Sequence, residues 1–321
     1  MSNPNNYTVG WICSITAEYV AAQAVLDEKH KLPEMVSSND NNSYALGRIG
    51  RHNVVIAVLP DGEYGISSAA RAAADLSHSF PNVRFGLLVG TGGGVPFKDK
   101  ECDMRLGDVV VSSPGEGSSN GGVFQYDFGK TIQEQSFQTT GFLNQPPRIL
   151  RTAITSLKAK YELEGHRFKE AIDAILKKHP RLQGKYQRPD PSSDRLYQRH
   201  IRHPMDKKSK CAESCGNNGP NLIPRPPRTE HQDDPMIHYG LIASANQLMK
   251  DATLRDRLAA EKDVVCFEME AAGLMNHFPC LVVRGICNYS DSHKNEEWQG
   301  YAAMVAAMYA KDLLGQIVPN R

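Results

Sequence analysis

The chain has 321 residues, of which 40% are hydrophobic, and its 37 basic and 36 acidic side chains leave a formal charge of +1. A chain of this length can bury a sizeable core in one large α/β domain or two smaller ones. The balanced charge supplies no field that would attract nucleic acid or an anionic membrane, so we expect neither partner and favour a small neutral ligand.

Cysteine usage and apolar runs bear on the cellular compartment. No apolar run approaches the roughly eighteen residues of a membrane helix, and the N-terminal residues do not resemble a signal sequence. Several of the seven cysteines, among them Cys13, Cys266 and Cys287, fall within apolar runs that resemble strands. Such cysteines fit a reducing compartment better than a disulfide framework, so we expect a cytoplasmic protein.

The first predicted elements are a short apolar strand over residues 7–13 and a helix that Thr16 can cap. Glu18 lies in the first turn of that helix, where a carboxylate complements the helix dipole. From the residues alone, Glu18 is therefore interpreted as a charge at a helix start.

Further strands are predicted over residues 43–49, 54–59 and 84–90, with an alanine-rich helix over residues 67–77. The strand over residues 84–90 runs into Thr91-Gly92-Gly93-Gly94. Consecutive glycines let the backbone approach a ligand closely and offer amide groups as donors. This turn lacks the GxGxxG spacing of a dinucleotide site, so by itself it is weak evidence for a binding loop.

The middle of the chain carries two amphipathic patterns and a polar stretch. Apolar residues recur at helical spacing over residues 149–161 and again over residues 168–176, with Gly165 between them, which predicts a helical hairpin. Residues 186–230 are rich in proline, arginine, lysine and asparagine, and we expect a loop or a partly disordered segment there.

This polar stretch contains His200 and His203 as HxxH, and Cys211 and Cys215 as CxxxC. Histidine and cysteine are zinc ligands, but the spacing is not that of a common zinc finger. We therefore expect ordinary loop residues and no metal, with a zinc site as the alternative.

The most informative stretch runs over residues 264–291, VVCFEMEAAGLMNHFPCLVVRGICNYSD. Glu268 and Glu270 stand at the entry of a predicted helical run over residues 271–277, and a buried strand over residues 281–287 follows. That strand ends at Asn288, with Asp291 three residues further on. Ligands of open α/β sheets collect at the carboxyl ends of strands, so we expect the chemistry here.

FEMEAAGL followed by VVRGICNYSD resembles the signature of the nucleoside phosphorylase and nucleosidase superfamily. The likeness is greatest to its methylthioadenosine and adenosylhomocysteine nucleosidases, which read VEMEA and later VRAISDxxD, and to the phosphorylase-like domains of fungal multidomain receptors. VGTGGGV (residues 89–95) and FQYDFG (residues 124–129) add to the resemblance. It implies a single α/β domain over residues 1–321, a twisted mixed sheet flanked by helices, with a helical and loop insertion over residues 130–236.

The resemblance also implies roles for individual residues. Glu18 would orient the attacking water, Glu270 would bind the ribose hydroxyls, and Met269 would pack under the sugar. Leu248 takes the place of an aromatic residue that stacks on adenine in the nucleosidases. Trp298 would cover the sugar or, equally, pack on a C-terminal helix over residues 301–314. The remaining residues expected at the substrate are Thr91, Gly92, Gly93, Met249, Phe267, Glu268 and Phe124, the last closing the neighbouring subunit's pocket in a homodimer.

Asn288 stands where the family has the aspartate that acts as general acid. An amide donates hydrogen bonds but does not ionise. Two accounts stay open: an engineered substitution that disables an active enzyme, or a natural sequence that binds without efficient turnover or uses Asp291 instead.

The function implied by the resemblance is hydrolysis of an adenosine-like purine nucleoside to base and ribose, without a cofactor. The alternatives are a phosphate-dependent phosphorylase, or a non-catalytic nucleoside-sensing module of a larger receptor, of which this chain would be a fragment.

Overall fold

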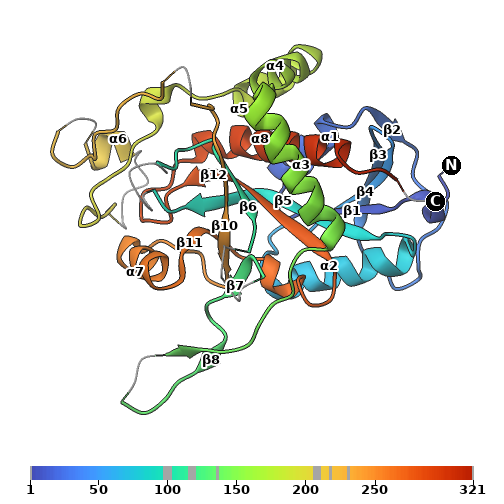
Figure 1. Cartoon of the computed structure of the whole chain (residues 1–321), viewed down its shortest axis with the longest axis horizontal. Coiled ribbons are helices and arrows are strands. Elements are labelled where there is room, and N and C mark those ends of the chain that lie inside the picture. Colours follow the sequence, from blue (N-terminus) through green and yellow to red (C-terminus); the bar gives the residue numbers. More distant parts are fainter. Residues whose placement is uncertain are drawn as a thin grey trace.

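In the computed structural model, a ten-stranded mixed sheet runs through the middle of the molecule (Figure 1). The structure describes residues 2–96, 103–114, 121–134, 137–204, 211–216, 219–229 and 232–319. From one edge to the other, the strand order is β2 (Glu28–His30), β3 (Ser43–Ile49), β4 (His52–Val58), β1 (Val9–Cys13), β5 (Phe85–Gly94), β12 (Cys280–Asn288), β6 (Val109–Ser112), β10 (Ile237–Ser244) and β11 (Val264–Glu268).

Part of the sheet closes on itself. β5 is parallel to both β1 and β12, whereas β6 is antiparallel to β12 and parallel to β10. β11 pairs with β10 on one side and with the end of β5 on the other, so five strands form a ring. The short β7 (Val123–Gln125) adds to β10, and β8 (Gly129–Lys130) pairs with β9 (Gln138–Thr139) outside this sheet.

Helices cover both faces of the sheet. In Figure 1, α2 runs below the sheet, and α8 lies above it with α1 beside it. The helices are α1 (Thr16–Ala24), α2 (Ile66–Ser79), α3 (Arg148–Glu164), α4 (Phe168–Lys178), α5 (Gln183–Tyr186), α6 (Cys211–Ser214), α7 (Ala252–Lys262) and α8 (Gln299–Gly315), with single 3₁₀ turns at Pro4–Asn6, Pro180–Leu182, Pro191–Ser193, Ala271–Gly273 and Glu296–Trp298.

α8 is buried on nearly all sides because it lies between two layers. It packs on β5 and β12, while α1, α3, α4 and α5 cover its other sides. A helix enclosed in this way needs apolar side chains all round, which explains its run of alanine, valine and methionine. The hairpin predicted from helical spacing is confirmed: it is α3 and α4, which turn at Gly165 with a φ of +68°. No helix in the described ranges combines the length and apolarity needed to span a bilayer.

The helix predicted over residues 271–277 is wrong in extent. Only Ala271–Gly273 forms a 3₁₀ turn, and irregular turns follow. The Leu274 carbonyl accepts from both the His277 and Phe278 amides, and Pro279 comes next. A residue that precedes proline is disfavoured in helical conformation, so the chain leaves the turn at once and enters β12.

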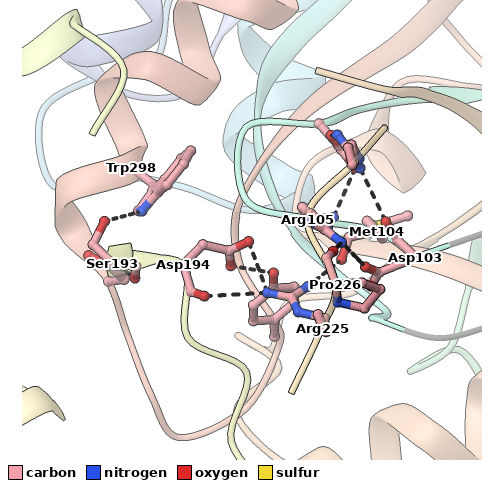
Figure 2. Close-up of polar contacts among 12 residues, drawn as sticks. Asp103, Met104, Arg105, Ser193, Asp194, Arg225, Pro226 and Trp298 are labelled. Carbon is pink, nitrogen blue, oxygen red and sulfur yellow. Dashed lines mark hydrogen bonds and ion pairs between the residues drawn. The ribbon is translucent and has the colours of Figure 1, made fainter. Parts of the chain in front are cut away.

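The polar stretch over residues 186–230 has little regular structure, but its described residues are anchored to the body of the fold. Figure 2 shows Arg225 between two carboxylates: its guanidinium lies 2.9 Å from Asp194 and 3.4 Å from Asp103. In the same view, the Trp298 indole nitrogen donates to the Ser193 hydroxyl at 3.0 Å. The expectation of a loop is therefore correct for the described part, but that part is not loose. Residues 205–210, 217–218 and 230 lie outside the described ranges.

A second buried charge cluster surrounds Asp108, which precedes β6. Its carboxylate accepts from the Arg228 guanidinium at 2.5 and 2.7 Å and from the His238 ring at 2.9 Å. The backbone amides of Arg105 and Met236 also donate to it. Burial by itself raises the pKa of Asp108, but the hydrogen bonds and charges of His238 and Arg228 lower it to about 2. Asp108 thus ties the C-terminal end of the polar stretch, at Arg228, to the sheet.

We predict that Asp108→Asn lowers the free energy of unfolding at neutral pH by about 3–5 kcal/mol, because the buried Arg228 guanidinium keeps only the more distant and more exposed Asp234 as a counter-charge. An unfolded aspartate has a pKa of about 3.9. Because the folded pKa is lower, the stability that Asp108 contributes is present above pH 4 or so and is lost as pH falls towards 2.

Urea unfolding as a function of pH provides the measurement. Between about pH 4 and 2, the wild-type protein should lose the stability that ionised Asp108 contributes, and Asp108→Asn should show no such loss. The matched control is Glu28→Gln, which breaks the exposed pair with Arg48 and should cost less than about 1 kcal/mol. Equal effects of the two substitutions would show that the cluster does not stabilise the fold.

Candidate functional site

A cavity of about 410 Å³ opens where the carboxyl ends of β1, β5, β11 and β12 meet. This volume lies within the range of small-ligand sites. Of the residues expected at the substrate, the following line it: Glu18, Thr91, Gly92, Gly93, Leu248, Met249, Phe267, Glu268, Met269, Glu270 and Asn288. Segments that are far apart in the sequence thus converge on one place.

Two expected residues do not line this cavity. Phe124 on β7 lines a neighbouring cavity of about 390 Å³ together with Phe128 and Phe142. Trp298 is 1% exposed, and its ring meets Tyr301 edge-on at 5.9 Å. The structure therefore places Trp298 in the packing of α8, which is one of its two sequence-based interpretations.

Arg284 on β12 is the central charge of the cavity floor. Its guanidinium pairs with Glu268 and lies 3.0 Å from Glu270. Gly90 on β5 makes room for this group: a Cβ there would lie 2.6 Å from the guanidinium and 2.5 Å from the Glu18 carboxylate. Burial alone would lower the pKa of Arg284, but the charges of Glu268, Glu270 and Glu18 outweigh it and raise the pKa.

Two carboxylates therefore pair with one guanidinium, and the charge of a third, Glu18, also acts on it. The pKa of Glu270 is raised, first by burial and then by the charges of Glu268 and Glu18, with Arg284 opposing the shift. Glu268 is held more tightly, since its carboxylate also accepts from the backbone amides of Glu270 and Ala271. The cavity floor consequently attracts positive charge, and Glu270 is the carboxylate that protonates more readily than an ordinary glutamate.

Glu18 serves the helix start and faces the cavity at the same time. One carboxylate oxygen accepts from the amides of Ser14 at 2.7 Å and Ile15 at 3.3 Å, which closes the first turn of α1. The other accepts from the amide of Thr91 at 2.7 Å and its hydroxyl at 3.2 Å. The side chain thus links the carboxyl ends of β1 and β5, and its orientation is fixed.

Asn288 ends β12 and is half-buried. Its amide oxygen accepts from the Ser290 backbone amide at 2.9 Å, and its amide nitrogen donates to the Cys287 sulfur at 3.4 Å. Ser290 has a φ of +55°, as such asparagine-centred turns allow. Gly93 lies opposite, and a Cβ there would come within 2.7 Å of the Asn288 oxygen. An aspartate at 288 would retain the contact to Ser290 but would have no N–H for the sulfur.

Sequence reasoning did not place several residues that line the cavity. Tyr64 and the pair Asn246 and Gln247 come from loops with no motif of their own, and Lys294 follows the recognised signature. The Asn246 side chain accepts from the Ile66 amide at 3.0 Å, which connects two of these loops. Only Tyr64 is far from any motif; Asn246 and Gln247 immediately precede Leu248, and Lys294 lies three residues after Asp291. The remaining lining residues without an expected substrate role are Ser14, Ile15, Arg284, Cys287, Ser290 and Gln299.

No protein-family model matches the chain. A nucleotide-binding leucine-rich repeat (NLR)-like protein of Hyaloscypha variabilis is 44% identical over 317 residues, which cover 99% of this chain and 30% of that protein. An ATP nucleosidase of Escherichia coli is 35% identical over 85 residues, 25% of this chain and 17% of that enzyme. The chain therefore spans less than a third of the length of these curated relatives.

Solved nucleosidases share the fold at low sequence identity. The methylthioadenosine/adenosylhomocysteine nucleosidase of Neisseria meningitidis is 15% identical, with a TM-score of 0.58 over 96% of this chain and 98% of that one. An Asp-to-Asn variant of the Helicobacter pylori nucleosidase, with methylthioadenosine in its active site, has a TM-score of 0.57 and is 13% identical. The match covers 97% of this chain and 99% of that one. The chain is thus a single α/β domain with the fold of these solved nucleosidases.

Proposed function

We propose that this domain binds a purine nucleoside and hydrolyses its N-glycosidic bond. The observation that carries the proposal is the cavity that gathers Glu18, Glu270 and Asn288 around the buried Arg284. N-glycosidic cleavage builds positive charge on the sugar and negative charge on the departing base. A site for it needs carboxylates at the sugar and a donor at the base, and this cavity contains both.

The sugar end of the proposed site is Glu270 with Met269. Glu270 receives one hydrogen bond from the Gly65 amide and pairs with Arg284 through its other oxygen. A carboxylate can accept further hydrogen bonds on each oxygen, so the ribose hydroxyls can donate to it. Its negative charge also favours the oxocarbenium character that develops at the sugar.

The attacking water is assigned to Glu18. Four hydrogen bonds from Ser14, Ile15 and Thr91 hold its carboxylate rigidly at the cavity edge. A carboxylate whose orientation is fixed in advance can position a water without cost at the moment of reaction. We infer hydrolysis rather than phosphorolysis because Glu18 lines this end of the cavity, and the described residues of β1 and β5 that line it include no arginine or lysine to bind phosphate.

The base end is assigned to Asn288 with Leu248. Leu248 is 48% exposed and lines the cavity, so an apolar base face can cover it. Asn288 can donate a hydrogen bond to the base but cannot transfer a proton, which makes the chemical step slow. Ligand binding in an Asp-to-Asn variant of a nucleosidase with this fold supports retention of nucleoside affinity.

A nucleoside 5′-phosphate is a second candidate substrate. The observation that favours it is Lys294, which lines the cavity, together with the local likeness to an ATP nucleosidase. An ammonium group at the cavity edge offers a counter-charge to phosphate. ATP therefore belongs in the substrate panel beside adenosine and methylthioadenosine.

The likeness to an NLR-like protein supports a sensing role as the alternative outcome. There the domain would report nucleoside occupancy to the rest of a larger receptor. A sensing module predicts saturable binding and no release of base from any form of the chain.

We expect Asn288→Asp to raise the rate of base release by roughly 10²–10⁴-fold, because it supplies a general acid. The measurement is release of free base from the three substrates, by each form, with and without phosphate. Asn53→Asp, the same change outside the cavity, is the control and should have no effect. Unchanged activity of Asn288→Asp would contradict the assignment of position 288, and release only with phosphate would make the domain a phosphorylase.

The raised pKa of Glu270 predicts a pH-dependent affinity. Only the ionised carboxylate accepts from both ribose hydroxyls, so nucleoside affinity should fall as pH drops through the Glu270 pKa. Because that pKa is raised, the fall should begin above the value of about 4.3 for an ordinary glutamate.

Calorimetric titration of the chain with adenosine tests this prediction. Glu270→Gln should weaken binding by about 1.5–3 kcal/mol, or roughly 10- to 150-fold, and should flatten the pH dependence. The exposed Glu261→Gln is the control. An unaltered pH dependence in Glu270→Gln would show that another group titrates.

A further inference from the structure

Three side chains of the polar stretch converge at one point outside the candidate cavity: His203, Cys211 and Cys215. The His203 Nδ1 atom lies 3.2 Å from the Cys215 sulfur and 3.5 Å from the Cys211 sulfur. All three potential ligand atoms lie within 4.8 Å of one another. Around a tetrahedral zinc ion, nitrogen and sulfur ligands are separated by about 3.5–3.8 Å, so this triangle needs little adjustment to hold one.

The local fold brings these side chains together without relying on a metal. Cys211 and Cys215 are one helical turn apart, and the Cys215 amide donates to the Cys211 carbonyl at 2.8 Å, so both thiols face the same side. The Asn221 side chain donates to the Cys215 carbonyl at 3.0 Å. The His203 backbone amide donates to the Ser292 hydroxyl at 2.9 Å.

His293 lies beside this group, although its ring nitrogens fall outside the set of ligand atoms that lie within 4.8 Å of one another. It is 7% exposed, and neither of its ring nitrogens makes a hydrogen bond to a described residue, although Nδ1 lies 3.5 Å from an Asp291 oxygen. Its ring stacks on Tyr197 at 4.0 Å and lies 6.2 Å from the ring of His203, between centroids. A buried imidazole without hydrogen bonds is costly, and coordination of a metal would satisfy it.

We propose that His203, Cys211 and Cys215 bind one Zn²⁺, with His293 as the fourth ligand. Two thiolates and two imidazoles form a ligand set that suits zinc, and a closed set of four protein ligands is typical of structural sites. Binding displaces the two thiol protons to solvent, and the two thiolates neutralise the charge of the ion. His200 is exposed and lies outside the cluster, so the HxxH pattern contributes one ligand rather than two.

The proposed ion would fasten the polar stretch to the segment that follows Asn288. His203 contacts Ser292, and the Cys211 sulfur lies 3.8 Å from the Lys294 carbonyl oxygen. Ser290 and Lys294 of this same segment line the candidate cavity. The zinc would therefore stabilise one wall of the cavity, a consequence that rests on the proposed function, whereas the metal site itself does not.

Metal content and a cobalt spectrum test the site. We expect about one zinc per chain to remain after the chain is purified under reducing conditions, loaded with zinc and exhaustively dialysed. Inductively coupled plasma mass spectrometry measures this content. Cys211→Ser, Cys215→Ser and His203→Ala should each reduce this content to background, and His293→Ala should reduce it at least tenfold at limiting free zinc. His200→Ala, a histidine of the same loop outside the cluster, and Cys280→Ala, a core thiol, should retain it.

Cobalt substitution reads out the geometry in the unaltered chain and so does not depend on whether the variants fold. Co²⁺ should give the visible absorption of a tetrahedral site and a thiolate-to-cobalt charge-transfer band, both absent from Cys211→Ser. A strong chelator should lower the midpoint of thermal unfolding of wild type by several degrees and leave that of Cys211→Ser unchanged.

Three results would overturn the proposal: background zinc in wild type after loading, full zinc content in Cys211→Ser and Cys215→Ser, or a Cys211–Cys215 disulfide that persists in the chain purified under reducing conditions. Full zinc content in His293→Ala would overturn the assignment of the fourth ligand. None of these measurements depends on release of base. Failure of the metal site and failure of the nucleosidase proposal are therefore distinguishable.

Discussion

The geometry of the candidate site depends on the buried pairing of Arg284 with Glu268 and Glu270. Removing one guanidinium and two carboxylates from water costs several kcal/mol per ion, and attraction between them repays this only when the hydrogen bonds are well made. Here the backbone amides of residues 65, 270 and 271 complete the set of donors. The cluster is therefore better understood as a positioning device than as a source of stability. It holds the carboxyl ends of β11 and β12 at a fixed separation, and the remaining negative charge faces the cavity.

The closed ring of strands explains why this pairing can form. β11 pairs antiparallel with the end of β5, Cys266 with Gly94 and Phe267 with Gly93, so its last residue, Glu268, comes close to β5 and β12. Side chains at Gly90 or Gly93 would occupy the space that Arg284 and Asn288 now use. The glycine run is thus required by the close approach of two strands as well as by any ligand. The spacing of these glycines in the sequence did not reveal this structural reason for them.

Much of the fold and part of the site were predictable from the sequence, for reasons that differ by element. Apolar runs predicted the strand over residues 84–90, and helical spacing predicted α3 and α4, because both signals are local. The residues of the signature, such as Glu270 and Asn288, could be placed through resemblance. Tyr64 could not, since only the tertiary fold brings its loop to the cavity. The apolar pattern of residues 271–277 suits a helix, so the short turn at residues 271–273 was not predicted. Pro279 and the start of β12 at Cys280 end the helical conformation early.

Hydrogen bonds and an ion pair connect the insertion to the end of β12 at the candidate site. The residue after Asn288 is held on both sides: the Tyr289 hydroxyl donates to Asp194 at 2.5 Å, and the Arg255 guanidinium donates to the Tyr289 carbonyl at 2.7 Å. Asp194 is in turn held by Arg225, so two parts of the polar stretch bear on the end of β12 (Figure 2). The polar stretch therefore preorganises position 288, and its sequence is constrained by the site although none of its described residues lines the cavity.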